Sequence, residues 1–151
     1  MNRYEEVGNL LLKRHDVTIK VIRRSMSGLA YIKERAICSP LPRTAKSFAI
    51  FCHEVGHIAQ GVIKPRWLEE LRAEEFAKGC FGEFGFSMPK AVKDRMKYHI
   101  SYKLAQALNR GMKHTPPELK SHRKYLAKVR CMNGKGETVG YVYRVDSRLI
   151  R

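Results

Sequence analysis

The segment from residue 44 to residue 61 constrains the fold more than any other part of this sequence. Thr44 is a favourable helix N-cap residue and Gly61 is favourable just after a helix end, so a helix of about four turns is predicted between them. Six apolar side chains form a wide stripe along this helix: Phe48, Phe51, Cys52, Val55, Ile58 and Ala59. Such a stripe must pack against other elements, so we expect this helix to lie against the core.

The predicted helix also carries the segment H-E-V-G-H at residues 53–57. Histidines four residues apart lie about 40° apart around a helix, so the imidazoles of His53 and His57 can reach one metal ion. Glu54 is not a ligand in this pattern but lies beside the metal, where it can accept a proton from bound water and pass it on. The histidines lie almost opposite the apolar stripe, which predicts a semi-enclosed cleft in front of them. The alternative interpretation is two structural histidines beside a surface glutamate.

A catalytic zinc site needs a third protein ligand and one position open to water. The next predicted helix, roughly residues 65–81, places four residues on one face: Glu70, Ala73, Glu74 and Ala77. Small alanines let this helix approach the histidine helix closely, so Glu70 can bind the metal. Glu74 can then accept a hydrogen bond from the second ring N–H of a ligand histidine. Three glutamates are alternative third ligands: Glu69, Glu74 and Glu75. An ordinary charged helix with alanine facing the core is the alternative interpretation.

Periodicity and turn residues predict the remaining elements, which together indicate an α+β fold. They are a helix over 4–14, a strand over 17–24, one or two short strands within 29–38, a long helix over 87–111, a helix after the Thr115-Pro116-Pro117-Glu118 capping box, and a β-hairpin over 128–145. We therefore expect a single domain over residues 1–151. It has a core over 1–85 and a basic helical extension over 86–151 that ends in the hairpin.

Charge is distributed unevenly along the chain. Thirty Lys and Arg against fourteen Asp and Glu give a net charge of +16. Residues 1–85 hold 14 basic and 10 acidic side chains, whereas residues 86–151 hold 16 and 4. This surplus favours contact with nucleic acid, acidic proteins or anionic surfaces, and a highly soluble surface is the alternative interpretation. Basic residues interleaved with Tyr125 within 113–130 favour non-specific phosphate contact, since no pattern for reading bases is present.

Cysteine usage and hydropathy predict a cytoplasmic protein. The four cysteines, at positions 38, 52, 80 and 131, show no C-x-x-C spacing and indicate reduced thiols. The apolar stretches are shorter than the roughly 20 residues of a membrane helix, so no membrane partner is expected. The N-terminal residues reach charged side chains too early for a signal peptide.

The H-E-V-G-H segment, followed by the E-x-x-A-E-x-F-A pattern at residues 70–77, resembles the ImmA/IrrE family of bacterial and phage zincin-like metallopeptidases. It is similar more broadly to gluzincins, whose third ligand is a glutamate on the helix after H-E-x-x-H. The resemblance covers roughly residues 1–85. It implies a zincin-like core with His53, His57 and Glu70 as ligands and Glu54 as the catalytic glutamate. It also implies that a strand over 35–39 forms the edge of the cleft, where an extended peptide substrate pairs.

We therefore expect a zinc metallopeptidase that binds one Zn²⁺ per chain and hydrolyses peptide bonds of a protein substrate, such as a regulatory protein. Glu54 would act as general base toward water and then as acid toward the leaving amine. The alternative is a basic nucleic-acid-binding or regulatory protein that keeps a zincin scaffold without peptidase activity. A purely structural metal is a third interpretation, which Glu54 argues against because such a site has no use for a base.

Overall fold

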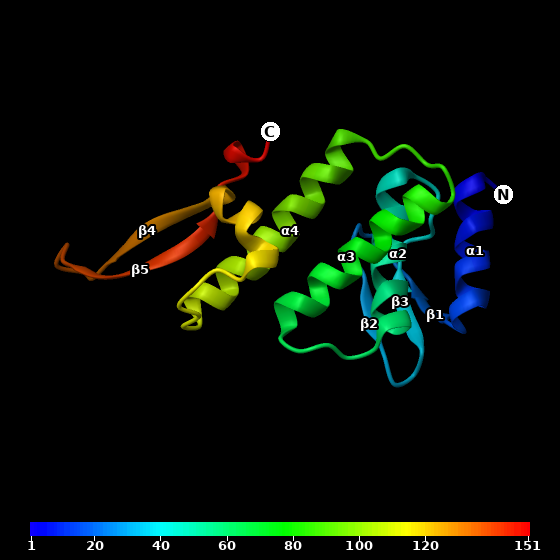
Figure 1. Ribbon diagram of the computed structural model, residues 1–151, viewed down its shortest axis with the longest axis horizontal. Helices are drawn as coiled ribbons and strands as arrows, with labels where there is room; N and C mark the ends of the chain where they lie inside the picture. Colours follow the sequence, from blue (N-terminus) through cyan, green and yellow to red (C-terminus); the bar gives the residue numbers. More distant parts are fainter. The chain divides into compact units, whose positions relative to one another are not determined.

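The computed structural model describes residues 1–151 and has an α+β fold, as the sequence predicts (Figure 1). The chain divides into two compact units, Met1–Val92 and Lys93–Arg151. Every residue predicted to bind metal or to take part in catalysis belongs to the first unit. None of the helices combines the length and the apolar character that crossing a membrane requires.

The first unit begins with helix α1 (Arg3–His15), close to the predicted range of 4–14. The Glu5 backbone N–H donates to the Asn2 side chain at 3.0 Å, and the Asn2 backbone N–H donates to the Glu5 carboxylate at 3.0 Å. This reciprocal pair satisfies donors that the first turn of a helix cannot pair internally. It therefore fixes the residue at which α1 starts.

A three-stranded sheet follows, made of β1 (Thr18–Ile22), β2 (Leu29–Tyr31) and β3 (Ala36–Ser39). β3 lies in the middle, parallel to β1 and antiparallel to β2, and all four of its residues are buried. The expectation that residues 35–39 form the edge of a cleft is therefore wrong. A short turn at 32–35 folds β3 back along β2 while β1 pairs with its other side, so the free edges belong to β1 and β2.

Helix α2 (Ala45–Gln60) starts and ends where its capping residues predict. The Ser47 backbone N–H donates to the Thr44 hydroxyl at 3.1 Å, which satisfies a donor of the first turn. Gly61 follows the last turn with a φ of +73°, a conformation that glycine adopts without steric strain. Its backbone N–H donates to the His57 carbonyl at 3.0 Å. The chain then reverses over residues 61–65 into α3 (Arg66–Glu83).

α2 is the central element of the first unit, because it contacts α1, α3, β2 and β3. Every residue from 47 to 58 is buried. The predicted apolar stripe therefore understates the burial of this helix, since neighbouring elements also cover the face that carries His53 and His57. Their side chains lie in an enclosed interior position and not at the rim of an open cleft.

Small residues let α3 approach α2 closely. Ala73 and Ala77 on α3 are fully buried, as their spacing predicts. A Cβ atom added at Gly56 would lie 3.0 Å from the Phe76 Cβ, which is shorter than an ordinary contact between carbon atoms. The glycine inside the H-E-V-G-H segment therefore serves the packing of α3 against α2.

An aromatic cluster around Phe48 holds α1, α2 and α3 together. The Phe48 ring centroid lies 5.2 Å from those of Phe81 and Phe86, and 5.3 Å from that of Tyr4. Both phenylalanine neighbours meet the Phe48 ring nearly edge-on, an arrangement that adds to the energy of apolar burial. Gly85, just after α3, has a φ of +70°, and this turn returns Phe86 to the cluster.

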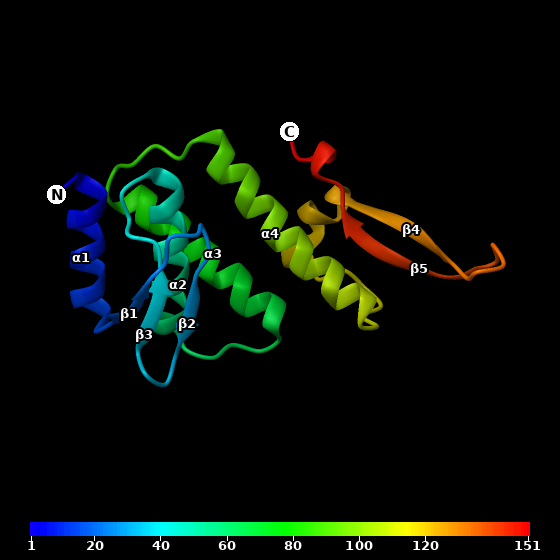
Figure 2. The ribbon, with the colours of Figure 1, turned by 180° about the vertical axis from the view of Figure 1, so that it is seen from behind.

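The second unit consists of one long helix, a β-hairpin and two 3₁₀ helices. Its elements are α4 (Lys90–Asn109), which starts just before the division, η1 (Pro117–Tyr125), β4 (Leu126–Met132), β5 (Thr138–Val145) and η2 (Ser147–Leu149). β4 and β5 are antiparallel, so the predicted hairpin is confirmed. Both views show this hairpin extending away from α4 and η1 (Figures 1 and 2).

The capping box predicted at residue 115 does not form. η1 is a 3₁₀ helix that begins at Pro117, and no side chain caps its start. The cause is the pair of consecutive prolines. Pro117 holds Pro116 in an extended conformation, with ψ of 148°. Pro116 is therefore the residue that directly precedes η1, and Thr115 lies one residue too early to cap it.

Candidate metal and catalytic site

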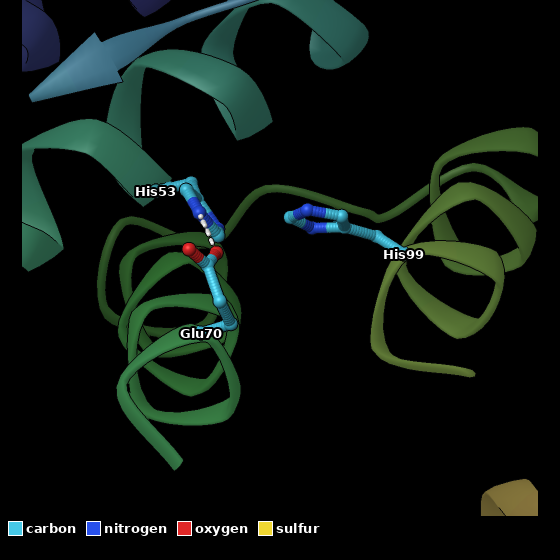
Figure 3. Close-up of side chains that lie close together, drawn as sticks. All are labelled: His53, Glu70 and His99. Atoms are coloured by element: carbon cyan, nitrogen blue, oxygen red, sulfur yellow. Dashed lines mark hydrogen bonds and ion pairs between the residues drawn. The ribbon is translucent and has the colours of Figure 1, made fainter. Parts of the chain in front are cut away.

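Three predicted ligand atoms lie close together where α2 and α3 meet. His53 Nε2 is 3.1 Å from His57 Nε2 and 3.0 Å from Glu70 Oε2, and His57 Nε2 is 3.5 Å from Glu70 Oε2. Figure 3 shows the His53 and Glu70 side chains pointing toward one another from their two helices. Ligand atoms around a tetrahedral zinc with bonds of about 2.0–2.1 Å are separated by roughly 3.3–3.4 Å. The three atoms are therefore spaced to hold one such ion.

Glu74 contacts the other ring nitrogen of His53. Its Oε1 is hydrogen-bonded to His53 Nδ1. An ionised carboxylate can only accept, so Nδ1 is the donor when the ring is neutral, and the lone pair is then on Nε2. This is the nitrogen that faces His57 and Glu70. The sequence predicts such a contact for one of the two histidines, and in the structure His53 makes it.

Glu69 occupies the corresponding place beside His57. Its Oε1 lies 3.6 Å from His57 Nδ1, and its Oε2 accepts a hydrogen bond from the Ile63 backbone N–H at 3.0 Å. Arg66 joins this carboxylate to the neighbouring one, because its guanidinium nitrogens lie 2.9 Å from Glu69 Oε1 and 2.9 Å from Glu70 Oε1. Glu69 therefore lies beside His57, with its oxygens paired to Ile63 and Arg66, and does not complete the triangle of ligand atoms.

The remaining candidate on α3, Glu75, points away from this group. Its side chain is exposed and forms an ion pair with Arg72 at 2.8 Å. Glu70, by contrast, is 3% exposed and has one oxygen within 3.5 Å of both Nε2 atoms. Among the glutamates considered from the sequence, the geometry thus favours Glu70 as third ligand. His99, the third residue labelled in Figure 3, lies on α4 in the second unit.

Glu54 lies against the loop that precedes β2. Its side chain is buried, and a Cβ atom added at Gly28 would lie 2.5 Å from Glu54 Cγ and 2.6 Å from Oε1. A residue with a side chain at position 28 would therefore displace the carboxylate. Because Gly28 directly precedes Leu29, this contact also brings the edge strand β2 beside Glu54.

Burial and mutual pairing together determine the protonation of these groups. Burial by itself lowers the pKa of His53, but hydrogen bonds to Glu70 and Glu74 outweigh it and raise that pKa to about 10. Burial raises the pKa of Glu70, but hydrogen bonds to His53 and His57 outweigh it and hold that pKa well below its usual range. Burial also raises the pKa of Glu54, and the nearby histidines partly oppose this. Without metal, the pairing with Glu70 and Glu74 therefore favours the protonated form of His53, and a metal ion would have to displace that proton.

Three of these contacts are not among the predictions from the sequence. The ion pairs of Arg66 with Glu69 and Glu70 were detectable, because these residues are spaced i, i+3 and i, i+4 on a predicted helix. The contact of Gly28 with Glu54 had no local signal, since the two residues are far apart in the chain and meet only when the sheet packs on α2.

No protein-family model, curated protein or solved structure matches this chain significantly. The interpretation of the site therefore depends on its residues and their geometry. The likeness to the ImmA/IrrE family is a resemblance over roughly residues 1–85, carried by the motifs at residues 53–57 and 70–77.

Proposed function

We propose that this protein is a zinc-dependent metallopeptidase with a zincin-like core, in which His53, His57 and Glu70 bind one Zn²⁺. The observation that carries the proposal is the triangle of Nε2, Nε2 and Oε2 atoms, with edges of 3.0 to 3.5 Å. All three side chains are buried, so grouping them would be costly unless they were paired or bound a metal. Glu74, hydrogen-bonded to His53 Nδ1, supplies the outer contact that a zinc-binding histidine usually has, and Glu69 Oε1 lies 3.6 Å from His57 Nδ1.

The proposed reaction is hydrolysis of a peptide bond. Zinc at this position would polarise the substrate carbonyl and lower the pKa of a water molecule. Glu54 would serve as the general base toward the attacking water and then as the general acid toward the leaving amine. Glu74 orients the His53 ring through Nδ1, and Arg66 holds Glu70 Oε1 so that Oε2 faces the histidines.

The sheet supports an extended segment of a protein as substrate. β2 is an edge strand that contacts α2, and the residue before it contacts Glu54. A peptide that paired with the free edge of β2 would run beside that carboxylate, since strand addition uses the unpaired backbone groups of an edge. The motif resemblance favours a regulatory protein as the source of this segment.

Elemental analysis of the purified protein tests the metal site. We expect about one zinc per chain in the wild type and loss of that zinc in His57→Ala, because two ligands are too few for a stable site. Glu75→Gln is the matched control, since it changes an exposed residue of α3 that makes no contact with the triangle. A wild-type protein that takes up no zinc under reducing conditions would overturn the proposal.

Glu54→Gln tests the reaction separately from metal binding. With zinc-loaded protein and a mixture of peptides analysed by mass spectrometry, we expect cleavage by the wild type and by Glu75→Gln. We expect none by Glu54→Gln, although its zinc content should be unchanged. Cleavage by Glu54→Gln would disprove the assigned role. A zinc-loaded wild type that cleaves no peptide or protein would support the alternative of a binding protein on a zincin scaffold.

A further inference from the structure

The β4–β5 hairpin has two chemically different faces. Residues that lie directly opposite one another in an antiparallel pair project from the same face, and successive pairs alternate between faces. One face carries the pairs Lys128–Tyr143 and Arg130–Tyr141. The other carries Ala127–Arg144, Val129–Val142 and Cys131–Gly140. Cations and aromatic rings are therefore concentrated on one face, whereas the other is mostly apolar or small.

Cation–π contacts connect the residues on the face that carries the lysine, the arginine and the two tyrosines. Lys128 Nζ lies 4.8 Å from the Tyr141 ring centroid and 5.9 Å from that of Tyr143. Arg123 of η1 extends the surface at the base of the hairpin, with its guanidinium carbon 4.7 Å from the Tyr143 centroid. We call these residues the basic-aromatic face: Arg123, Lys128, Arg130, Tyr141 and Tyr143.

This face is accessible and lies in the most basic part of the chain. Tyr141 is 55% exposed, and Lys128 and Arg130 are also exposed. The second unit holds 15 Lys and Arg against 4 Asp and Glu, a net charge of +11. A protein surface of this charge attracts polyanions over distances of about a Debye length.

We propose that the basic-aromatic face binds single-stranded nucleic acid. Arg123, Lys128 and Arg130 contact phosphates, and an unpaired base stacks on the exposed Tyr141 ring, with the half-buried Tyr143 ring beside it. An exposed aromatic ring flanked by cations fits this ligand better than a duplex, because the bases of a duplex are already stacked inside the helix. Recognition is independent of sequence, since the face offers charge and ring surface without a set of groups that reads base edges.

Fluorescence anisotropy with the full-length protein tests this inference. The probe is a labelled single strand of about 20 nucleotides of mixed sequence, titrated at several salt concentrations. Arg130→Gln should weaken binding about fivefold at 0.1 M salt and reduce the salt slope by about 0.7, as expected for one lost phosphate contact. Tyr141→Leu should weaken binding at least about fivefold and leave the salt slope unchanged, because it removes a stacking surface and no charge.

Two matched controls separate this face from general charge and from general loss of tyrosine. Arg144→Gln removes one charge from the opposite face of the same hairpin, and Tyr102→Leu removes an exposed tyrosine from α4. Both should bind within about twofold of the wild type. Equal losses in Arg130→Gln and Arg144→Gln, or tighter binding of the matching duplex, would overturn the proposal.

The surface is independent of the proposed metal site. The four hairpin and helix variants should keep wild-type zinc content and peptide cleavage, and Glu54→Gln should bind the single strand as the wild type does. Circular dichroism checks that each variant is folded. Failure of either proposal therefore leaves the other testable.

Discussion

Replacing Gly28 with alanine tests the function of Glu54 without changing a metal ligand or the glutamate itself. The new Cβ would lie 2.5 Å from Glu54 Cγ and 2.6 Å from Oε1. Carbon atoms in contact are normally about 3.5 Å apart or more, so the deficit is roughly 1 Å. Because the φ of Gly28 is not positive, alanine itself causes no backbone strain there. The Glu54 side chain must therefore move by about 1 Å or change rotamer.

A displacement of that size has a predictable effect on the reaction. Misplacing a reacting group by about 1 Å can cost on the order of 100-fold in rate, which corresponds to about 2.7 kcal/mol of transition-state stabilisation. We therefore expect Gly28→Ala to lower kcat/KM about 100-fold. Zinc content should stay at one per chain, since the three atoms nearest the new Cβ all belong to Glu54.

The assay is cleavage of a fluorogenic peptide derived from whichever sequence the wild type cuts, run beside elemental analysis. Gly82→Ala is the matched control, because it makes the same substitution on α3 and its new Cβ meets no atom within 4 Å. It should keep wild-type activity and gain up to about 1 kcal/mol of stability from helix propensity. Wild-type activity in Gly28→Ala would refute the reasoning, and so would loss of zinc.

Two further predictions concern the metal itself. Glu74→Gln should weaken zinc binding about 10- to 100-fold, because it removes the carboxylate that orients His53, whereas Glu75→Gln should not; competition with a chelator measures both. Zinc affinity should rise about tenfold per pH unit between pH 6.5 and 8.5, since binding displaces the proton held on His53, whose pKa is raised to about 10 in the metal-free protein. Calorimetry in buffers of different ionisation enthalpy should show about one proton released, and a flat pH profile would contradict this. In the metal-free protein the same raised pKa stabilises the fold fully below about pH 6.5, and that contribution is lost as the pH rises through about 10.

The parts of the site that the sequence predicts are those set by local geometry. The caps at Thr44 and Gly61 and the four-residue spacing of His53 and His57 follow from the helical repeat alone. The parts that it does not predict depend on contacts between distant segments. The motif resemblance implies an edge strand over 35–39, whereas the position of β3 is decided by β1 and β2, which pair with its two sides.

The sequence pattern does not decide whether Glu69 or Glu70 is the third ligand. The packing of α3 against α2 decides it. Adjacent residues on a helix point about 100° apart, so the rotation of α3 about its axis decides which carboxylate reaches the two Nε2 atoms. Ala73 and Ala77 share the face of Glu70 and are fully buried, and Phe76 lies against Gly56. This close packing sets the rotation that turns Glu70 toward the histidines and leaves Glu69 beside His57 Nδ1. The proposed ligand set thus depends on small residues that are not part of it.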